Sequence, residues 1–105
     1  MGKYIQVSTT TGSKEDALKI AKKLLQERLA ACIHVGGPIT SIYRWEGKTQ
    51  EDEEWRVTIK SRNDIYERLE KTIKEIHSYE VPEIIGTPLT VGSSEYFEWM
   101  DEELA

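Results

Sequence analysis

The sequence of 105 residues is 31% charged and 38% hydrophobic and carries a formal net charge of -5. This composition is typical of a globular protein and unlike that of a disordered chain, and the length fits one domain spanning residues 1–105. With an isoelectric point near 5.1, the chain lacks the basic field that non-specific binding to nucleic acid or to an anionic membrane needs. We therefore expect neither among its partners, whereas the charge is compatible with cation binding.

The single cysteine, Cys32, excludes a framework of intrachain disulfides and fits a reducing compartment. The first ten residues, MGKYIQVSTT, contain no apolar core of a secretory signal. No stretch approaches the roughly 18 apolar residues of a membrane span. These features predict a cytoplasmic protein.

The first part of the chain predicts a strand followed by a helix. Residues 4–9 alternate, with Ile5 and Val7 on one side, as in a half-buried strand. Ser13 followed by Asp16 is typical of a helix start, since each side chain can satisfy a free backbone N–H group. The apolar stripe that follows at helical spacing consists of Ala17, Ile20, Ala21, Leu24, Leu25 and Leu29.

Residues 31–35, ACIHV, predict a second strand, which Gly36-Gly37-Pro38 interrupts. Because proline cannot donate to a sheet ladder, we expect this strand to carry a bulge or to lie at a sheet edge. It resumes as ITSIYRWEG, and we expect it to pair with EEWRVTIKS, which has Trp55, Val57 and Ile59 on one face. The polar segment EGKTQED between them predicts the turn of a long hairpin.

A second helix is expected over residues 63–77, with Asn63 as its cap. Its buried stripe consists of Ile65, Leu69, Ile73 and Ile76. The segment PEIIGTPLTV then predicts a fourth strand, in which Pro88 again suits a sheet edge. Ser93 or Ser94 is expected to cap a short last helix.

The order of these elements predicts an α+β fold, the ferredoxin-like βαββαβ sandwich with an antiparallel sheet and an extra C-terminal helix. In that topology the second and fourth strands are the edges, and these are the strands that contain proline. An exposed edge invites another chain, and the second strand ends in Tyr43, Arg44 and Trp45, residue types enriched at interfaces. We expect these three residues at an inter-subunit contact of a symmetric oligomer; the alternative is a solvated hairpin tip.

Two long blocks carry a resemblance to a known family: LAACIHVGGPITSIYRWEGKTQEDEEWRVTIKS and IHSYEVPEIIGTPLTVGSSEYFEWM. They resemble the signature blocks of the CutA family, the divalent-cation tolerance proteins, and the likeness covers essentially the whole chain. The matching residues are Cys32, the run from Ser41 to Lys48, and His77, Tyr79, Glu80, Pro82 and Glu83. The resemblance implies a cytoplasmic, ferredoxin-like homotrimer linked to tolerance of copper and other divalent metals, similar in architecture to the PII-type trimeric signalling proteins.

Two positions depart from the family pattern. Ser78 replaces a usual proline, and His34 stands where asparagine is common. His34 adds a candidate metal ligand two residues from Cys32, and the two side chains share a face of the strand if no bulge lies between them.

Histidine and thiolate suit copper and zinc, and carboxylates commonly complete such sites. The candidate metal ligands are therefore Cys32, His77, Glu80 and Glu83, with His34 as an additional one. A single chain offers no preformed cage, because proline at position 82 biases the preceding residue away from helical geometry, so we expect subunits to share the site. The alternatives are a helix C-terminal cation for His77, a buried structural thiol for Cys32 and solvated or ion-paired carboxylates.

A catalytic pair of Cys32 with His34 or His77 lacks an oxyanion motif and a third orienting residue, so we do not expect an enzyme. The sequence predicts a homotrimer that binds divalent cations without catalysis, with copper foremost, and that acts in metal tolerance and the response to metal ions. The alternative is a PII-like trimeric signalling or scaffold protein that binds a small ligand in inter-subunit clefts, with the 43–48 hairpin end contributing to contacts.

Overall fold

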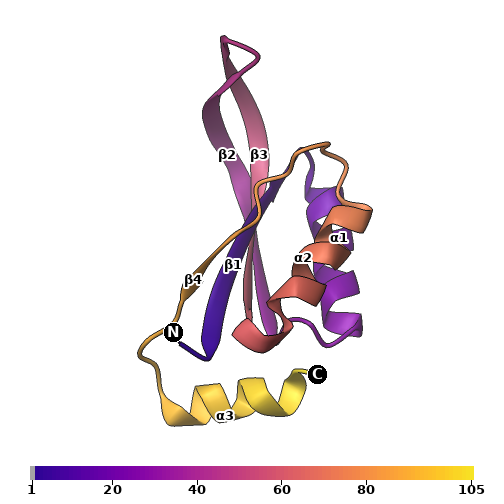
Figure 1. Ribbon diagram of the computed structural model, residues 1–105. Coiled ribbons are helices and arrows are strands. Elements are labelled where there is room, and N and C mark those ends of the chain that lie inside the picture. The colour runs from indigo at the N-terminus through magenta and orange to yellow at the C-terminus, as the bar shows by residue number, and fades with distance from the viewer. Residues whose placement is uncertain (1) are drawn as a thin grey trace.

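A computed structural model describes residues 2–105 of the protein. In chain order the elements are β1 (Tyr4–Thr11), α1 (Lys14–Gln26), β2 (Cys32–Trp45), β3 (Lys48–Arg62), the 3-10 turn η1 (Asn63–Ile65), α2 (Tyr66–Ile76), β4 (Ile85–Pro88) and α3 (Ser94–Glu103). Over these residues the strands form one antiparallel sheet in the order β2-β3-β1-β4, and α1 and α2 lie together on one side of it (Figure 1). The α+β, ferredoxin-like prediction is confirmed, and both proline-containing strands lie at edges.

The core fills the space between the sheet and the two long helices. In β1 the predicted alternation holds, because Ile5 and Val7 face the helices and Val7 pairs across the sheet with the buried Ile59. The helices contribute apolar stripes to the same cluster. Its largest fully buried apolar side chains are Val7, Ile20, Leu24, Leu29, Val57, Ile59, Leu69, Ile73 and Met100.

Helix α1 begins as predicted, with the Ser13 hydroxyl accepting a 3.1 Å hydrogen bond from the backbone N–H of Asp16. Leu25 departs from the predicted apolar stripe, because its side chain is 45% exposed. The helix ends at Gln26, and Arg28 adopts a left-handed conformation with φ of 57°. This turn carries Leu29 back into the core. Leu29 therefore packs in the core, whereas Leu25 is left in solvent.

Two boundaries after β3 also differ from the prediction. Asn63 opens η1 rather than capping α2, and its backbone N–H donates to the carbonyl of Lys3. Helix α2 starts at Tyr66 without a side-chain cap, since the 3-10 turn leads directly into it. Strand β4 is also shorter than predicted, because only residues 85–88 pair with β1.

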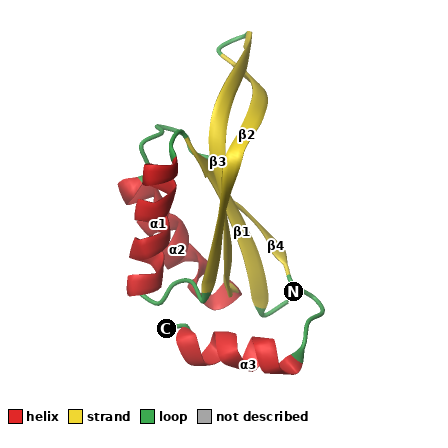
Figure 2. Cartoon of the chain, turned by 180° about the vertical axis from the view of Figure 1, so that it is seen from behind, coloured by secondary structure: helices red, strands yellow, loops and turns green. Residues whose placement is uncertain are grey.

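Strands β2 and β3 form a hairpin that projects beyond the body of the protein (Figure 2). The turn consists of Glu46 and Gly47 alone, with φ of 50° and 77°, which is the geometry of a two-residue turn that follows the twist of the strands. The predicted seven-residue turn is therefore wrong, because residues 48–52 belong to β3. The hairpin lengthens the protein to 44 Å against 25 and 23 Å in the other directions.

The predicted interruption at Gly36-Gly37-Pro38 is a bulge. It changes which residues of β2, the odd-numbered or the even-numbered ones, lie on each face of the sheet. Gly36 pairs with Arg56, and the next paired residue, Ile39, lies opposite Glu54. Three steps along β2 thus match two along β3, so odd-numbered residues of β2 face the helices before the bulge and the opposite side after it. We call this opposite side, turned away from α1 and α2, the far face.

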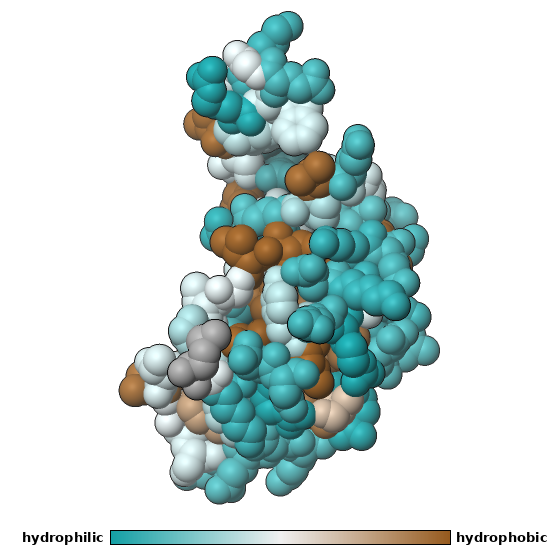
Figure 3. Space-filling model, in the orientation of Figure 1, coloured by the Kyte–Doolittle hydropathy of each residue, from teal (hydrophilic) through white to brown (hydrophobic). Residues whose placement is uncertain are grey.

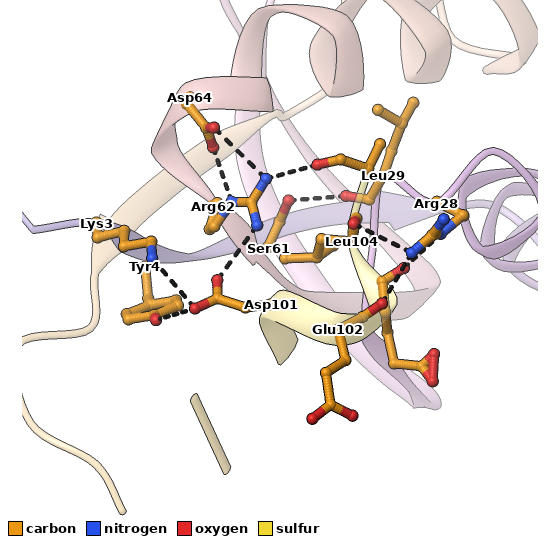
Figure 4. A network of polar contacts seen from close by, with 12 residues as sticks. Lys3, Tyr4, Arg28, Leu29, Ser61, Arg62, Asp64, Asp101, Glu102 and Leu104 are labelled. Carbon is orange, nitrogen blue, oxygen red and sulfur yellow. Dashed lines mark hydrogen bonds and ion pairs between the residues drawn. The ribbon is translucent and has the colours of Figure 1, made fainter. Parts of the chain in front are cut away.

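Helix α3 covers the lower end of the far face. Phe97 stacks on Tyr4 with ring centroids 4.1 Å apart, and the Ser93 hydroxyl caps the helix by accepting from the N–H of Tyr96. Asp101 accepts hydrogen bonds from the Tyr4 hydroxyl at 2.7 Å and from Arg62 at 3.2 Å (Figure 4). These contacts fix α3 against the first and third strands, and α3 does not extend over the upper part of the far face (Figure 1).

Candidate functional site

The segment from residue 77 to 84, which we call the connector, leaves the end of α2 and crosses the sheet to β4 (Figure 1). His77 holds its start. The ring nitrogen Nε2 lies 2.8 Å from the carbonyl oxygen of Thr10, and the backbone N–H of Tyr79 donates to Nδ1 at 3.0 Å. One ring nitrogen thus donates and the other accepts, which is the neutral tautomer with its proton on Nε2.

This arrangement occupies both ring nitrogens of His77 with backbone groups. A metal at either nitrogen would have to replace one of these hydrogen bonds. The histidine therefore joins the connector to β1. Ser78 donates to a carboxylate oxygen of Asp16 at 3.3 Å and adds a contact to α1.

A second link joins the connector to β3. The Tyr79 hydroxyl donates a 2.7 Å hydrogen bond to Glu54, whose side chain is on the far face and only 7% exposed. Burial, followed by the hydrogen bond to Glu54, raises the pKa of Tyr79 well above its usual range. The connector is thus held to β3 by a side-chain hydrogen bond to a carboxylate.

Between the connector and the upper part of the hairpin lies a groove of about 860 Å³. We call it the hairpin groove; it is lined by residues 10, 39–43, 45, 54, 56 and 78–83. Apolar side chains gather on this side of the protein near the base of the projecting hairpin (Figure 3). The groove thus combines a buried carboxylate with apolar and aromatic walls.

The predicted contact residues lie at this upper end. Tyr43 and Trp45 line the groove, because the bulge places odd-numbered residues of β2 on the far face. The Tyr43 hydroxyl donates to Asp52, and this hydrogen bond is the first cause of a raised pKa of Tyr43. Arg44 is exposed and pairs across the hairpin with Thr49. All three predicted residues are therefore accessible in the single chain.

The structure brings Cys32 and His34 together. No bulge lies between them, so both are on the far face, and the Cys32 sulfur lies 3.9 Å from Nε2 of His34. Cys32 is half-buried and His34 is exposed. Tyr96 of α3 is also near, since burial and then the neighbouring Cys32 raise the pKa of this tyrosine. A thiol and an imidazole thus meet at the free edge of β2.

The other predicted ligands lie elsewhere. Cys32 pairs with Lys60 of β3, whereas Thr10, which holds His77, pairs with Arg56. These positions are four residues apart on β3, which corresponds to about 13 Å. Glu80 and Glu83 are exposed on the connector, and within residues 2–105 no three or more His, Cys, Asp or Glu side chains gather as a metal-binding group.

Sequence reasoning missed Glu54. It lies in the run Glu51-Asp52-Glu53-Glu54, where nothing in the residue types marks one carboxylate as buried. The only available signal was the position of Glu54 next to Trp55, since alternation along β3 puts these two side chains on opposite faces of the sheet. The burial of Glu54 on the far face comes from Tyr79 of the connector, and the residue types in this run do not indicate that contact.

No helix among residues 2–105 combines the length and the apolar character that a membrane span requires.

Comparison with known proteins identifies the family. Residues 5–103 match the family described as CutA1 divalent ion tolerance protein. The chain is 42% identical to the divalent-cation tolerance protein CutA of Thermus thermophilus over 91% of its own length and 93% of that protein. It is also 42% identical to the chloroplastic protein CutA of Arabidopsis thaliana, of which it spans 53%.

The fold agrees with that of solved relatives. A structure of the divalent cation tolerance protein from Thermus thermophilus superimposes with a TM-score of 0.95 at 39% sequence identity, covering 97% of this chain and 99% of that one. The resemblance predicted from the two sequence blocks is confirmed. The chain belongs to the CutA1 family of divalent ion tolerance proteins.

Proposed function

We propose that this protein acts in tolerance of divalent metals as a cytoplasmic, non-catalytic homotrimer that binds divalent cations, with copper as the preferred ion. Membership of a divalent ion tolerance family supports the involvement of metal. The observation that carries a binding site is the pairing of Cys32 and His34, because thiolate and imidazole are the ligand types that copper and zinc favour.

The distance between these two groups fits a shared ion. Metal–sulfur and metal–nitrogen bonds of about 2.3 and 2.0 Å at a tetrahedral angle put the two ligand atoms about 3.5 Å apart. The observed 3.9 Å between the Cys32 sulfur and Nε2 of His34 needs only a small side-chain adjustment. Two ligands leave the coordination incomplete, so we propose that Glu80 and Glu83 contribute where subunits meet. His77 is the least favoured predicted ligand, because both its nitrogens are bound to backbone groups.

The homotrimer is supported by the shape of the chain. β2 is a 14-residue edge strand, and an unpaired edge of that length is a template for another chain. Its upper part carries Tyr43 and Trp45, which are 40% and 46% exposed. Burying such rings between subunits is favourable. Light scattering that finds a monomer would contradict this part of the proposal.

Copper titration tests the metal site. We expect Cys32→Ser and His34→Asn each to weaken copper binding by roughly tenfold or more, since each removes one ligand of an incomplete set. Zn²⁺ serves as a reference ion that undergoes no redox reaction with the thiol. His77→Ala is expected to keep the affinity and stoichiometry of the unmodified chain, and unchanged binding in both Cys32→Ser and His34→Asn would overturn the proposed ligand pair.

A second candidate function is favoured by one observation, the hairpin groove. Its volume lies within the range of small-molecule sites, and it includes the hairpin end that a PII-like ligand-binding trimer would use. A rise in melting temperature with a small molecule and no response to metals would favour this function over the first.

A further inference from the structure

The carboxylate of Glu54 has no cationic partner within residues 2–105. Its one hydrogen bond there comes from the neutral Tyr79 hydroxyl, and none of the ion pairs among these residues includes it. The Glu54 residue is only 7% exposed, and a carboxylate taken out of water is stable only when its charge is compensated. Its second oxygen is therefore left for a donor from outside the single chain.

Arg56 is a cation on the same face that has no anionic partner in the described part of the chain. It lies two residues after Glu54 in β3, so alternation places both side chains on the far face. Arg56 is exposed and takes part in none of the ion pairs there. The Tyr79 hydroxyl holds Glu54 at the connector. One face thus presents an anion and a cation that do not pair with each other within the chain.

These two charges are complementary between copies of the chain. Both residues line the hairpin groove, and Arg56 is the single basic residue among the described residues of the lining. A second copy that covers the groove with its own far face therefore brings an Arg56 toward this Glu54. In a ring with cyclic symmetry each chain gives one such contact and receives one. The set of ion pairs closes without leaving a charge unpaired.

The surroundings of Glu54 favour a protein surface over solvent. Tyr43 and Trp45 are 40% and 46% exposed, and Val81 of the connector is 68% exposed. All three line the groove. Covering them removes aromatic and apolar area from water, as in the core of a subunit interface. Such surroundings also exclude water from an ion pair at the centre of the contact.

We propose that a second copy of the chain covers the hairpin groove, with Arg56 of the partner subunit supplying the cation that Glu54 lacks. Tyr79 positions the carboxylate, and the same ion pair repeats three times around the ring. The inference rests on the proposed homotrimer and goes beyond it, because it names the two side chains that join one subunit to the next. It is independent of the Cys32–His34 pair.

A disulfide between copies tests the contact directly. Two proteins of different tag length are made in a Cys32→Ser background, one with Glu54→Cys and the other with Arg56→Cys, and are unfolded and refolded together. We expect mild oxidation to join a chain of one kind to a chain of the other, which a non-reducing gel resolves by size. Glu53→Cys in place of Glu54→Cys is the matched control, since Glu53 is exposed, pairs with Thr40 and does not line the groove. It is expected to give no such product.

Subunit exchange measures whether the two charges act together. Glu54→Gln keeps the shape and an acceptor for the Tyr79 hydroxyl, and Arg56→Gln removes the cation. Each variant is mixed with its isotopically labelled form and followed by native mass spectrometry. We expect either one to exchange subunits roughly tenfold faster than the unmodified protein or more, because it leaves a buried charge unpaired. The double variant should exchange more slowly than the product of the two effects predicts, and Glu53→Gln should exchange as the unmodified protein does.

The possible failures are distinguishable. If the unmodified protein is a trimer but the Glu54→Cys and Arg56→Cys chains form no disulfide, or if the two glutamine substitutions act independently, the ion pair is overturned and the homotrimer stands. If light scattering finds the unmodified protein to be a monomer, the ion pair and the homotrimer are overturned together. The glutamine variants keep the test decisive even where a cysteine at position 54 prevents folding.

Discussion

Nε2 of His77 donates a 2.8 Å hydrogen bond to the carbonyl oxygen of Thr10, which joins the end of α2 to the end of β1. On its other side the same ring accepts the N–H of Tyr79. One side chain thus satisfies two backbone groups and sets the path of the connector. The histidine that the sequence marks as a metal ligand has a structural task in the folded chain.

His77→Ala is expected to destabilise the protein by about 1–3 kcal/mol, because it leaves a partly buried carbonyl and an N–H group without their partner. Urea unfolding followed by circular dichroism measures the change. His34→Ala is the matched control, since His34 is exposed, and its effect should be within about 0.5 kcal/mol. Equal stability of the two variants would contradict the structural role of His77.

Gly37 and Gly36 form a second matched pair. A Cβ atom at Gly37 would lie 2.6 Å from Cδ1 of Trp55, whereas one at Gly36 would meet nothing within 4 Å. Gly37→Ala is therefore expected to cost about 1–3 kcal/mol through displacement of the indole. Gly36→Ala should stay close to the unmodified chain. The comparison uses thermal unfolding, and a Gly37→Ala protein as stable as Gly36→Ala would show that the ring is free to move.

Arg28 combines an unfavourable backbone with favourable side-chain contacts. Its φ of 57° is a conformation that glycine adopts without strain, yet its guanidinium donates to the carbonyls of Glu102 and Glu103 at the end of α3. We expect Arg28→Ala to lose about 1–3 kcal/mol and Arg28→Gly to lose about 1 kcal/mol less than that. Hydrogen exchange in α3 should rise in both variants, and unchanged protection would contradict the anchoring role.

Stability should fall at alkaline pH. Burial, followed by the hydrogen bond to Glu70, raises the pKa of Tyr66 from 10.0 to about 12. Since the folded state holds this proton more tightly than the unfolded state, the contribution is complete below pH 10 and is lost as the pH rises toward 12.

Urea unfolding at intervals across this window measures the loss, which for one tyrosine is at most about 1.4 kcal/mol per pH unit. Tyr66→Phe is expected to show a flatter dependence, and so is Tyr79→Phe, because the pKa of Tyr79 is also raised. A slope identical to that of the unmodified chain in both variants would contradict the assignment.

The topology was predictable because periodicity and proline act locally. Alternation in β1 and the helical stripes identified the elements, and Pro38 and Pro88 identified the edges of the sheet. Boundaries that depend on tertiary contacts were not predictable. Leu25 is exposed because the turn at Arg28 returns Leu29 to the core in its place.

The candidate site was predictable in part for a related reason. Cys32 and His34 share a face because alternation within an unbroken strand decides it. The burial of Glu54 depends on a contact with Tyr79, 25 positions later in the chain. Residue types alone do not carry that information.

The bulge at Gly36-Gly37-Pro38 divides one strand into two parts with different tasks. Below it, odd-numbered residues such as Val35 pack against the core; above it, odd-numbered residues such as Tyr43 line the groove. Substitutions of the odd-numbered residues on the lower part should therefore alter folding, while those of the odd-numbered residues on the upper part alter the groove with the fold intact. Removing one of the two bulged residues would leave Ile39 opposite Glu54 and both parts on their present faces, because two steps along β2 would then match two along β3. Loss of a residue above the bulge would instead turn Tyr43 and Trp45 to the other side of the sheet, so the hairpin is expected to tolerate a change of length at the bulge better than elsewhere.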